Sequence, residues 1–186
     1  MLHLFEAVNC KSFSADADAI TLACSGGQDD FNIPKLHSAW NIAYAAMDVS
    51  GSFTFAVSCT LFCKKKFDAA GIYLLFEGCR VKHGLEMYGE ADFRVVTVRS
   101  FPLSDESNGS VVPLSLVDLI ATRDGGIFSF YSRSGGQLRF ERAFAVEDAP
   151  ETIKVGLFVQ SPFSDGASAR FEKLDIKNEP FEHVRL

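Results

Sequence analysis

The chain has 186 residues, and its 24 acidic residues outnumber its 18 Lys and Arg residues to give a formal net charge of -6. Its content of 47% hydrophobic and 12% aromatic residues is enough to build a core, which excludes an intrinsically disordered protein. The acidic balance argues against nucleic acid as a partner, because phosphate backbones are bound by clustered Lys and Arg.

The clearest periodic pattern runs from Ser52 to Cys63. Phe, Val, Cys and Leu residues at the odd positions alternate with mostly smaller or polar residues at the even positions. A period of two places one set of side chains on a buried strand face. We therefore predict a strand over Ser52–Cys63, with Phe55 among the side chains in the core.

Eight further segments have the apolar and β-branched composition of strands. They are 70–76, 79–88, 93–99, 116–123, 127–132, 138–146, 153–160 and 169–177. Asp-Gly and Gly-Gly pairs between several of them supply the positive φ angles that tight hairpin turns require. Strands at this spacing predict an all-β fold, an antiparallel two-sheet sandwich of the jelly-roll type.

Two segments are predicted to lie outside the strands. Ile33–Tyr44 is predicted to hold a turn of helix after Pro34, and Phe101–Pro113 is predicted to be a long loop because it combines Ser, Asp, Asn and Gly with two prolines. No internal repeat or linker divides the sequence. We expect a single domain over residues 1–178, followed by a polar C-terminal tail over 179–186.

The five cysteines, at positions 10, 24, 59, 63 and 79, are odd in number and show no CxxC spacing. Cys59 and Cys63 fall on the apolar face of a predicted strand, so we expect free thiols in a reducing compartment. No segment approaches the about 20 apolar residues that span a bilayer, and the N-terminus lacks the pattern of a secretory signal. We therefore expect a cytoplasmic protein that has no membrane partner.

Common catalytic signatures are absent from the sequence. It has no nucleophile elbow, phosphate-binding loop or dinucleotide-binding glycine motif. The four histidines lack zinc-site spacing, and His83, which alternates with Lys82, is expected to be a hydrogen-bonded histidine of the core or of an interface. Asp105, Ser107 and Asn108 do not follow the order of an EF-hand and are interpreted as turn-forming residues. We expect no metal ion and no cofactor.

Carboxylate pairs suited to glycoside hydrolysis, which needs them about 5–10 Å apart, are also scarce. Glu90 and Asp92 follow Gly89, where a turn is expected, and the E-x-D-x-E motif familiar from sandwich-fold glucanases does not occur. Lys82 and Glu86 lie on one face of a predicted strand about 13 Å apart, so they line one groove without touching. The sequence therefore predicts no catalytic residue.

Several short motifs occur in a characteristic order. They are Phe67–Tyr73 (FDAAGIY), Val81–Glu86 (VKHGLE), Val95–Val98 (VVTV), Ser104-Asp105, Val155-Gly156 and Gln160–Pro162 (QSP). Over about residues 50–177, this ordered set resembles an uncharacterised domain family with the concanavalin A-like lectin/glucanase fold. The resemblance implies a two-sheet jelly roll with a concave face, the face that holds glycans in better-known relatives. The family includes intracellular proteins named for regulating enolase, which also implies a role other than that of a lectin.

The resemblance implies a ligand site on the concave face. The implied ligand-binding residues are Tyr73, Lys82, Glu86, Asp105 and Gln160. The family's K-x-G-x-E strand corresponds to Lys82, Gly84 and Glu86, where Gly84 would leave a shallow floor for a flat ligand. The alternative interpretation is that Lys82 and Glu86 are solvated charges on an outer sheet face.

The remaining implied roles are carried over in the same way. Tyr73 would offer a sugar ring an aromatic platform and a hydroxyl, unless it is ordinary core packing. Asp105 would begin a loop that closes one end of the site, and Gln160 would present its amide to ligand hydroxyls. Family members often have a Trp before the Lys of the motif, where this chain has Arg80-Val81, and its single tryptophan is Trp40.

Three hypotheses for function follow from these observations. The first is a non-catalytic binding module that recognises a carbohydrate or sugar-like ligand on the concave face. The second is an interaction protein that docks on a metabolic enzyme and regulates it. The third is a glycoside hydrolase with an unfamiliar carboxylate pair, for example Glu86 with Asp105.

Overall fold

A computed structural model of the chain describes residues 2–90 and 92–182. A single 3-10 turn, η1 (Leu2–Leu4), precedes the strands in this part of the chain. The strands are β1 (Glu6–Val8), β2 (Ser12–Ala15), β3 (Ala19–Ala23), β4 (Asp30–Ile33), β5 (His37–Trp40), β6 (Ala43–Ser50), β7 (Phe53–Phe62), β8 (Ala69–Phe76), β9 (Cys79–Met87), β10 (Phe93–Ser100), β11 (Ser104–Val112), β12 (Leu116–Asp124), β13 (Ile127–Ser134), β14 (Gln137–Ala145), β15 (Thr152–Gln160) and β16 (Ser168–Lys177).

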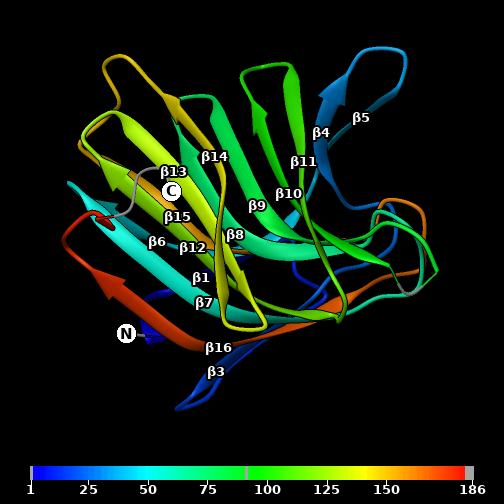
Figure 1. Cartoon of the computed structure of the whole chain (residues 1–186). Helices are drawn as coiled ribbons and strands as arrows, with labels where there is room; N and C mark the ends of the chain where they lie inside the picture. The colour runs from blue at the N-terminus through cyan, green and yellow to red at the C-terminus, as the bar shows by residue number, and fades with distance from the viewer. Residues whose placement is uncertain (1, 91, 183–186) are drawn as a thin grey trace.

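Within the described residues, the strands form two seven-stranded antiparallel sheets that pack as a sandwich (Figure 1). The first sheet has the order β1-β6-β15-β8-β9-β10-β11, and the second has the order β14-β13-β12-β7-β16-β3-β2. Strands β4 and β5 pair with each other as a separate hairpin. The prediction of an all-β, two-sheet, concanavalin A-like sandwich is confirmed.

The core lies between the two sheets and follows from the alternation seen in the sequence. On β7, Phe53 and Phe55 are completely buried, as the period of two predicts. They face apolar side chains of the first sheet, which include Ile72 on β8, Leu85 on β9 and Leu157 on β15. The inner faces of both sheets are thus apolar, which leaves the outer faces free to carry polar groups.

The predicted long loop is wrong. Most of Phe101–Pro113 forms β11, which pairs with β10 in a register that sets Glu106 opposite Val98 and Asn108 opposite Val96. Strand β11 is an edge strand, and its polar side chains stay exposed to water, so its composition lacks the apolar alternation of a core strand. Pairing with β10, a tertiary interaction, overrides the local composition.

The predicted turn of helix after Pro34 is also wrong. Pro34 and Lys35 form the turn between β4 and β5, where the Leu36 N–H donates to the Ile33 carbonyl over 3.0 Å. Lys35 has a φ of 70°, the positive angle found at the third position of type II turns, and proline favours the second position. The residues interpreted as a helix start are therefore the residues of a hairpin turn.

The predicted tail is described as far as Glu182. The Thr54 hydroxyl donates to the Glu179 carbonyl over 2.8 Å, and the Phe181 N–H donates to the Thr122 hydroxyl over 2.9 Å. Residues 179–182 thus lie against the outer face of the second sheet, while 183–186 lie outside the described residues.

All five cysteines belong to the described residues and are free thiols, as expected from their spacing. Burial raises the pKa of the Cys59 thiol, which faces the core. In the part of the chain that the structure describes, no helix has the length and apolar character needed to cross a membrane.

Truncation of a core aromatic provides a test of the sandwich. Because Phe55 is completely buried, Phe55→Ala is expected to lower the free energy of unfolding by about 3–5 kcal/mol. The matched control on the same strand is Phe62→Ala, since Phe62 is 56% exposed and its loss should cost under about 1 kcal/mol. Urea denaturation measures both, and equal costs would contradict the assignment of the two faces of β7.

Candidate functional site

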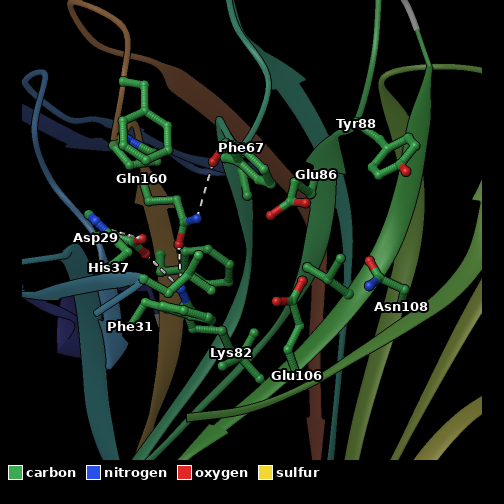
Figure 2. A pocket seen from close by; sticks show the side chains of 17 residues that line it. Asp29, Phe31, His37, Phe67, Lys82, Glu86, Tyr88, Glu106, Asn108 and Gln160 are labelled. Carbon is green, nitrogen blue, oxygen red and sulfur yellow. Dashed lines mark hydrogen bonds and ion pairs between the residues drawn. The ribbon is translucent and has the colours of Figure 1, made fainter. Parts of the chain in front are cut away.

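A pocket of about 330 Å³ hollows the outer face of the first sheet, the face turned away from the second sheet. Side chains of β8, β9, β10, β11 and β15 form its base, as Figure 2 shows in part. Its walls come from the β4–β5 hairpin and from the loops that follow β7 and β15. The lining residues thus come from five stretches of the sequence that meet at one site: 29–37, 67–69, 82–88, 96–108 and 158–163.

Strand β9 supplies both a core face and a pocket face. Lys82 and Glu86 point outward into the pocket, whereas His83 between them points inward and is completely buried. The His83 ring lies 2.9 Å from the Thr97 hydroxyl and 2.9 Å from the Tyr131 carbonyl oxygen. Burial lowers the pKa of His83 to about 4, so this histidine is neutral, which agrees with the expectation of a hydrogen-bonded core histidine.

A buried ion pair occupies one end of the pocket. The Lys82 ammonium donates to Asp29 Oδ1 over 2.8 Å and to Gln160 Oε1 over 2.7 Å (Figure 2). Gln160 in turn donates from Nε2 to the Phe67 carbonyl over 3.1 Å, and His37 Nε2 lies 3.2 Å from Asp29 Oδ2. Lys82 and Gln160 thus form hydrogen bonds to other groups of the protein, and these bonds hold the walls of the pocket in place.

The neighbouring Asp30 fixes the hairpin to the sheet by a second contact. The Tyr73 hydroxyl donates to Asp30 Oδ2, and Arg80 Nε lies 3.7 Å from the same oxygen. Burial, together with the charge of Asp30, raises the pKa of Tyr73. Tyr73 is only 1% exposed and does not line the pocket, so its expected role as an aromatic platform is wrong.

The open floor expected at Gly84 is also absent. A Cβ at Gly84 would come within 2.8 Å of the Phe158 ring, which shows that Phe158 fills the space above the glycine. Phe158, on β15, itself lines the pocket and sits beside Tyr73 with 6.2 Å between ring centroids. The base of the pocket is therefore an aromatic ring rather than bare backbone.

Glu86 is the one pocket carboxylate that is buried without a hydrogen-bond donor in residues 2–90 and 92–182. Its side chain faces the cavity in Figure 2, and the residue is 6% exposed. Burial and the nearby charge of Glu106 raise the pKa of Glu86 to about 7. This carboxyl is therefore ready to exchange a proton or to accept hydrogen bonds from a ligand.

Strand β11 brings Glu106 and Asn108 to the pocket and directs Asp105 elsewhere. Glu106 and Asn108 line the cavity (Figure 2), whereas Asp105 is exposed and forms an ion pair with Arg142 on β14. The expectation that Asp105 starts a closing loop is wrong, and the carboxylate pair of Glu86 with Asp105 is not formed. Residues 104–109 are polar or small at both odd and even positions, so no local signal in the sequence marks Glu106 and Asn108 as pocket residues.

Aromatic rings form the wall opposite β11. Phe31, on β4, and Phe67 and Phe163, in two loops, line the pocket together with His37. Phe163 lies edge-on to Phe67 at 5.8 Å and to His37 at 5.4 Å between ring centroids. Sequence analysis missed these residues because they come from three separate segments, and single aromatics among 18 Phe residues carry no signal.

Three of the five residues implied by the resemblance, Lys82, Glu86 and Gln160, lie at the pocket. Among the described residues, no group of three or more His, Cys, Asp or Glu side chains has the geometry of a metal site.

The antiparallel two-sheet sandwich is of the concanavalin A-like class, and its pocket lies on the outer face of the first sheet. Within that class, the chain belongs to DUF1349, a family of proteins of unknown function, whose family model matches residues 8–179. The matched region begins well before residue 50, so it includes the β4–β5 hairpin and Asp29. A comparison with curated proteins finds no match.

Several solved structures share the fold. A functionally unknown protein from Saccharomyces cerevisiae superposes with a TM-score of 0.86 at 18% identity, and the alignment covers 97% of this chain and 98% of the yeast chain. The legume lectin-like domain from Entamoeba histolytica has a TM-score of 0.62 at 8% identity, covering 94% of this chain and 90% of that domain.

A third similar structure is a larger enzyme. Xylan beta-1,4-xylosidase from Bacillus halodurans C-125 has a TM-score of 0.62 at 13% identity over 92% of this chain, but the chain spans only 39% of that enzyme. At these identities, the three similarities establish a shared fold.

Removing the ammonium of the buried ion pair should strongly destabilise the protein. Lys82→Met leaves Asp29 buried without its cation and is expected to cost about 3–5 kcal/mol in the free energy of unfolding. Adding Asp29→Asn to this variant should recover part of the loss. As a control, Lys154→Met removes the exposed pair with Asp48 and should cost under about 1 kcal/mol. Additive costs in the double variant would contradict a direct pairing.

The raised pKa of Glu86 predicts a stability that falls as pH rises. The folded protein favours the protonated carboxyl, so stability is lost from about the ordinary value of 4.5 up to about 7. Glu86→Gln should therefore stabilise the protein by up to about 3 kcal/mol near pH 8 and by almost nothing near pH 4. Urea denaturation at both pH values measures this, with Glu147→Gln as the control, since Glu147 is exposed and lies outside the pocket. A pH-independent effect of Glu86→Gln would refute the assignment.

Proposed function

We propose that the protein is a non-catalytic binding domain and that its pocket recognises a carbohydrate or sugar-like ligand. The observation that carries the proposal is the carboxyl of Glu86, which faces a cavity of about 330 Å³ without a donor from the described residues. Leaving a buried carboxylate without a partner costs free energy, and a ligand hydroxyl would relieve that cost.

The rest of the pocket suits the same chemistry. Asn108 offers both an amide donor and an oxygen acceptor, and Glu106 adds a second acceptor on the same strand. Phe31, Phe67 and Phe163 offer flat apolar surfaces against which the C–H face of a sugar ring packs. An apolar cavity with a few directed polar groups is the usual form of a small-ligand site.

The similar folds give independent support, since one solved neighbour is described as lectin-like and another as a xylosidase. The free thiols favour a reducing compartment, so the proposed ligand is a sugar of the cytoplasm. No membrane or nucleic acid is part of the proposed function.

A glycan array probed with the purified protein tests the proposal. Phe163→Ala should weaken binding of any captured sugar by about tenfold, because it removes a stacking surface. Phe62→Ala is the matched control, since Phe62 is a similarly exposed phenylalanine that does not line the pocket. Binding that survives Phe163→Ala and Asn108→Ala together would place the sugar elsewhere, and an array without any binding would overturn the proposal.

Two observations favour other functions. Glu86 with a raised pKa beside Glu106 has the character of an acid and a second carboxylate, so glycoside hydrolysis is a second candidate. Hydrolysis of a sugar identified on the array, lost in both Glu86→Gln and Glu106→Gln, would establish this function.

Docking on a metabolic enzyme is a further candidate, because the apolar residues Leu36 and Phe163 are exposed at the mouth of the pocket. A pull-down from cytosol tests it, with Leu36→Asp as the control variant.

A further inference from the structure

The charges that line the pocket are unbalanced. Among the described lining residues, Asp29, Glu86 and Glu106 are carboxylates, whereas Lys82 is the ammonium group. Lys82 is already paired with Asp29 at 2.8 Å, and His37 also lies against Asp29. No ion pair within the described residues includes Glu86 or Glu106, so two carboxylates face the cavity without a cation.

Glu86 is the stronger indication of a missing partner. More than nine-tenths of the residue is buried, its carboxylate is aimed into the cavity (Figure 2), and no described residue donates a hydrogen bond to it. Burying a carboxylate in this way is costly unless a cation or a set of donors accompanies it. A bound ligand is the component that would supply either one.

Two nearby cations are held outside the pocket. Arg94 lies directly opposite Glu86 in the β9–β10 register, but its guanidinium stacks over the Tyr88 ring, 3.2 Å from the centroid. The Lys66 ammonium lies 4.6 Å from the centroid of the same ring. Neither side chain lines the cavity. The Lys66 ammonium also lies 4.8 Å from the centroid of the Phe67 ring, so both cations sit at the margin of the cavity, whose described lining carries three carboxylates and one ammonium.

We propose that the ligand carries a protonated amine that pairs with Glu86 and lies within reach of Glu106, so that the pocket selects an amino sugar. This proposal rests on the sugar-binding function proposed above and specifies its ligand class. An ammonium group has three donors, and its hydrogen bonds to carboxylates are about twice as strong as neutral ones.

The same electrostatics rejects acidic sugars. A uronate or a sugar phosphate would bring a further negative charge beside Glu86 and Glu106 in a partly desolvated cavity, where like charges repel strongly. The predicted order of affinity is therefore amino sugar, then neutral sugar, then acidic sugar.

Isothermal titration calorimetry on the full chain tests this order with four probes. They are the β-1,4 trisaccharide of glucosamine, its fully N-acetylated counterpart, cellotriose and a triuronate. We expect the glucosamine trisaccharide to bind about tenfold more tightly than cellotriose, because one charge-assisted contact replaces a neutral one. The N-acetylated sugar should lose this advantage, since acetylation removes the charge.

Variants of the acidic residues provide the matched controls. Glu86→Gln keeps the shape of the side chain and should abolish the preference for the amine, so that this variant binds the glucosamine trisaccharide and cellotriose with equal affinity. The control is Asp105→Asn, which removes a carboxylate from the same edge strand. Because Asp105 pairs with Arg142 outside the pocket, this variant should leave all four affinities unchanged.

Measuring the protons released on binding gives a second test, because a ligand that binds only through its shape would release none. Near neutral pH, Glu86 is partly protonated because its pKa is about 7. The charged groups that act on it are Glu106 on β11, Lys82 on β9, Asp29 ahead of β4 and Arg94 on β10. An incoming ammonium stabilises the ionised carboxyl, so binding should release a fraction of a proton, detected as a difference in heat between two buffers.

The outcomes separate the two proposals. Equal affinities for cellotriose and the glucosamine trisaccharide, or a preference that persists in Glu86→Gln, would overturn the amine proposal and leave sugar binding intact. Tighter binding of the triuronate would do the same. Failure of all four trisaccharides to bind would overturn the amine proposal, whereas the sugar-binding proposal falls only if the glycan array also shows no binding.

Discussion

The buried ion pair between Lys82 and Asp29 is the interaction on which the site depends. It joins β9, in the middle of the first sheet, to the segment that leads into the β4–β5 hairpin, and Gln160 extends it to the loop before β8. A buried charge without a partner costs several kcal/mol, so each of these groups requires the others in place. The hairpin is therefore held over the sheet by electrostatics rather than by apolar packing alone.

That arrangement turns a flat sheet face into a pocket. The outer face of the first sheet would otherwise expose a few polar side chains and the aromatic ring of Phe158. The anchored hairpin adds Phe31 and His37 as a wall, and the two flanking loops add Phe67 and Phe163. In Figure 2, Glu86 and Glu106 lie on the side of Asn108, together with the Tyr88 ring, whereas Phe31 and His37 lie on the other side beside Asp29. A division of this kind suits a ligand that has both an apolar face and polar substituents.

The positions of the positive charges determine which ligand the proposed site would favour. Each nearby cation is committed to another partner, because Lys82 is paired with Asp29 and Arg94 is stacked on Tyr88. Glu86 therefore has no ion-pair partner among the described residues, although the charges of Lys82 and Arg94 act on it from a distance. This arrangement lowers the stability of the free protein above neutral pH and reserves the most favourable electrostatic contact for a ligand.

Local patterning alone was enough to predict the sandwich and several of its strands, because the period of two on β7 and the turn residues between later strands are local signals. The pocket face of β9 followed from the same alternation, which set Lys82 and Glu86 on one side and His83 on the other. The resemblance to the family then pointed to the sheet face that carries the pocket.

Tertiary contacts decided the rest. Strand β11 exists because it pairs with β10, and that pairing directs Glu106 rather than Asp105 to the cavity. Tyr73 is lost to the site because Asp30, from a distant segment, accepts a hydrogen bond from its hydroxyl. The aromatic wall assembles from segments that are remote in sequence, and no local pattern encodes which of them meet. Alternation fixes which face a side chain occupies, whereas the packing of distant segments fixes what that face encloses.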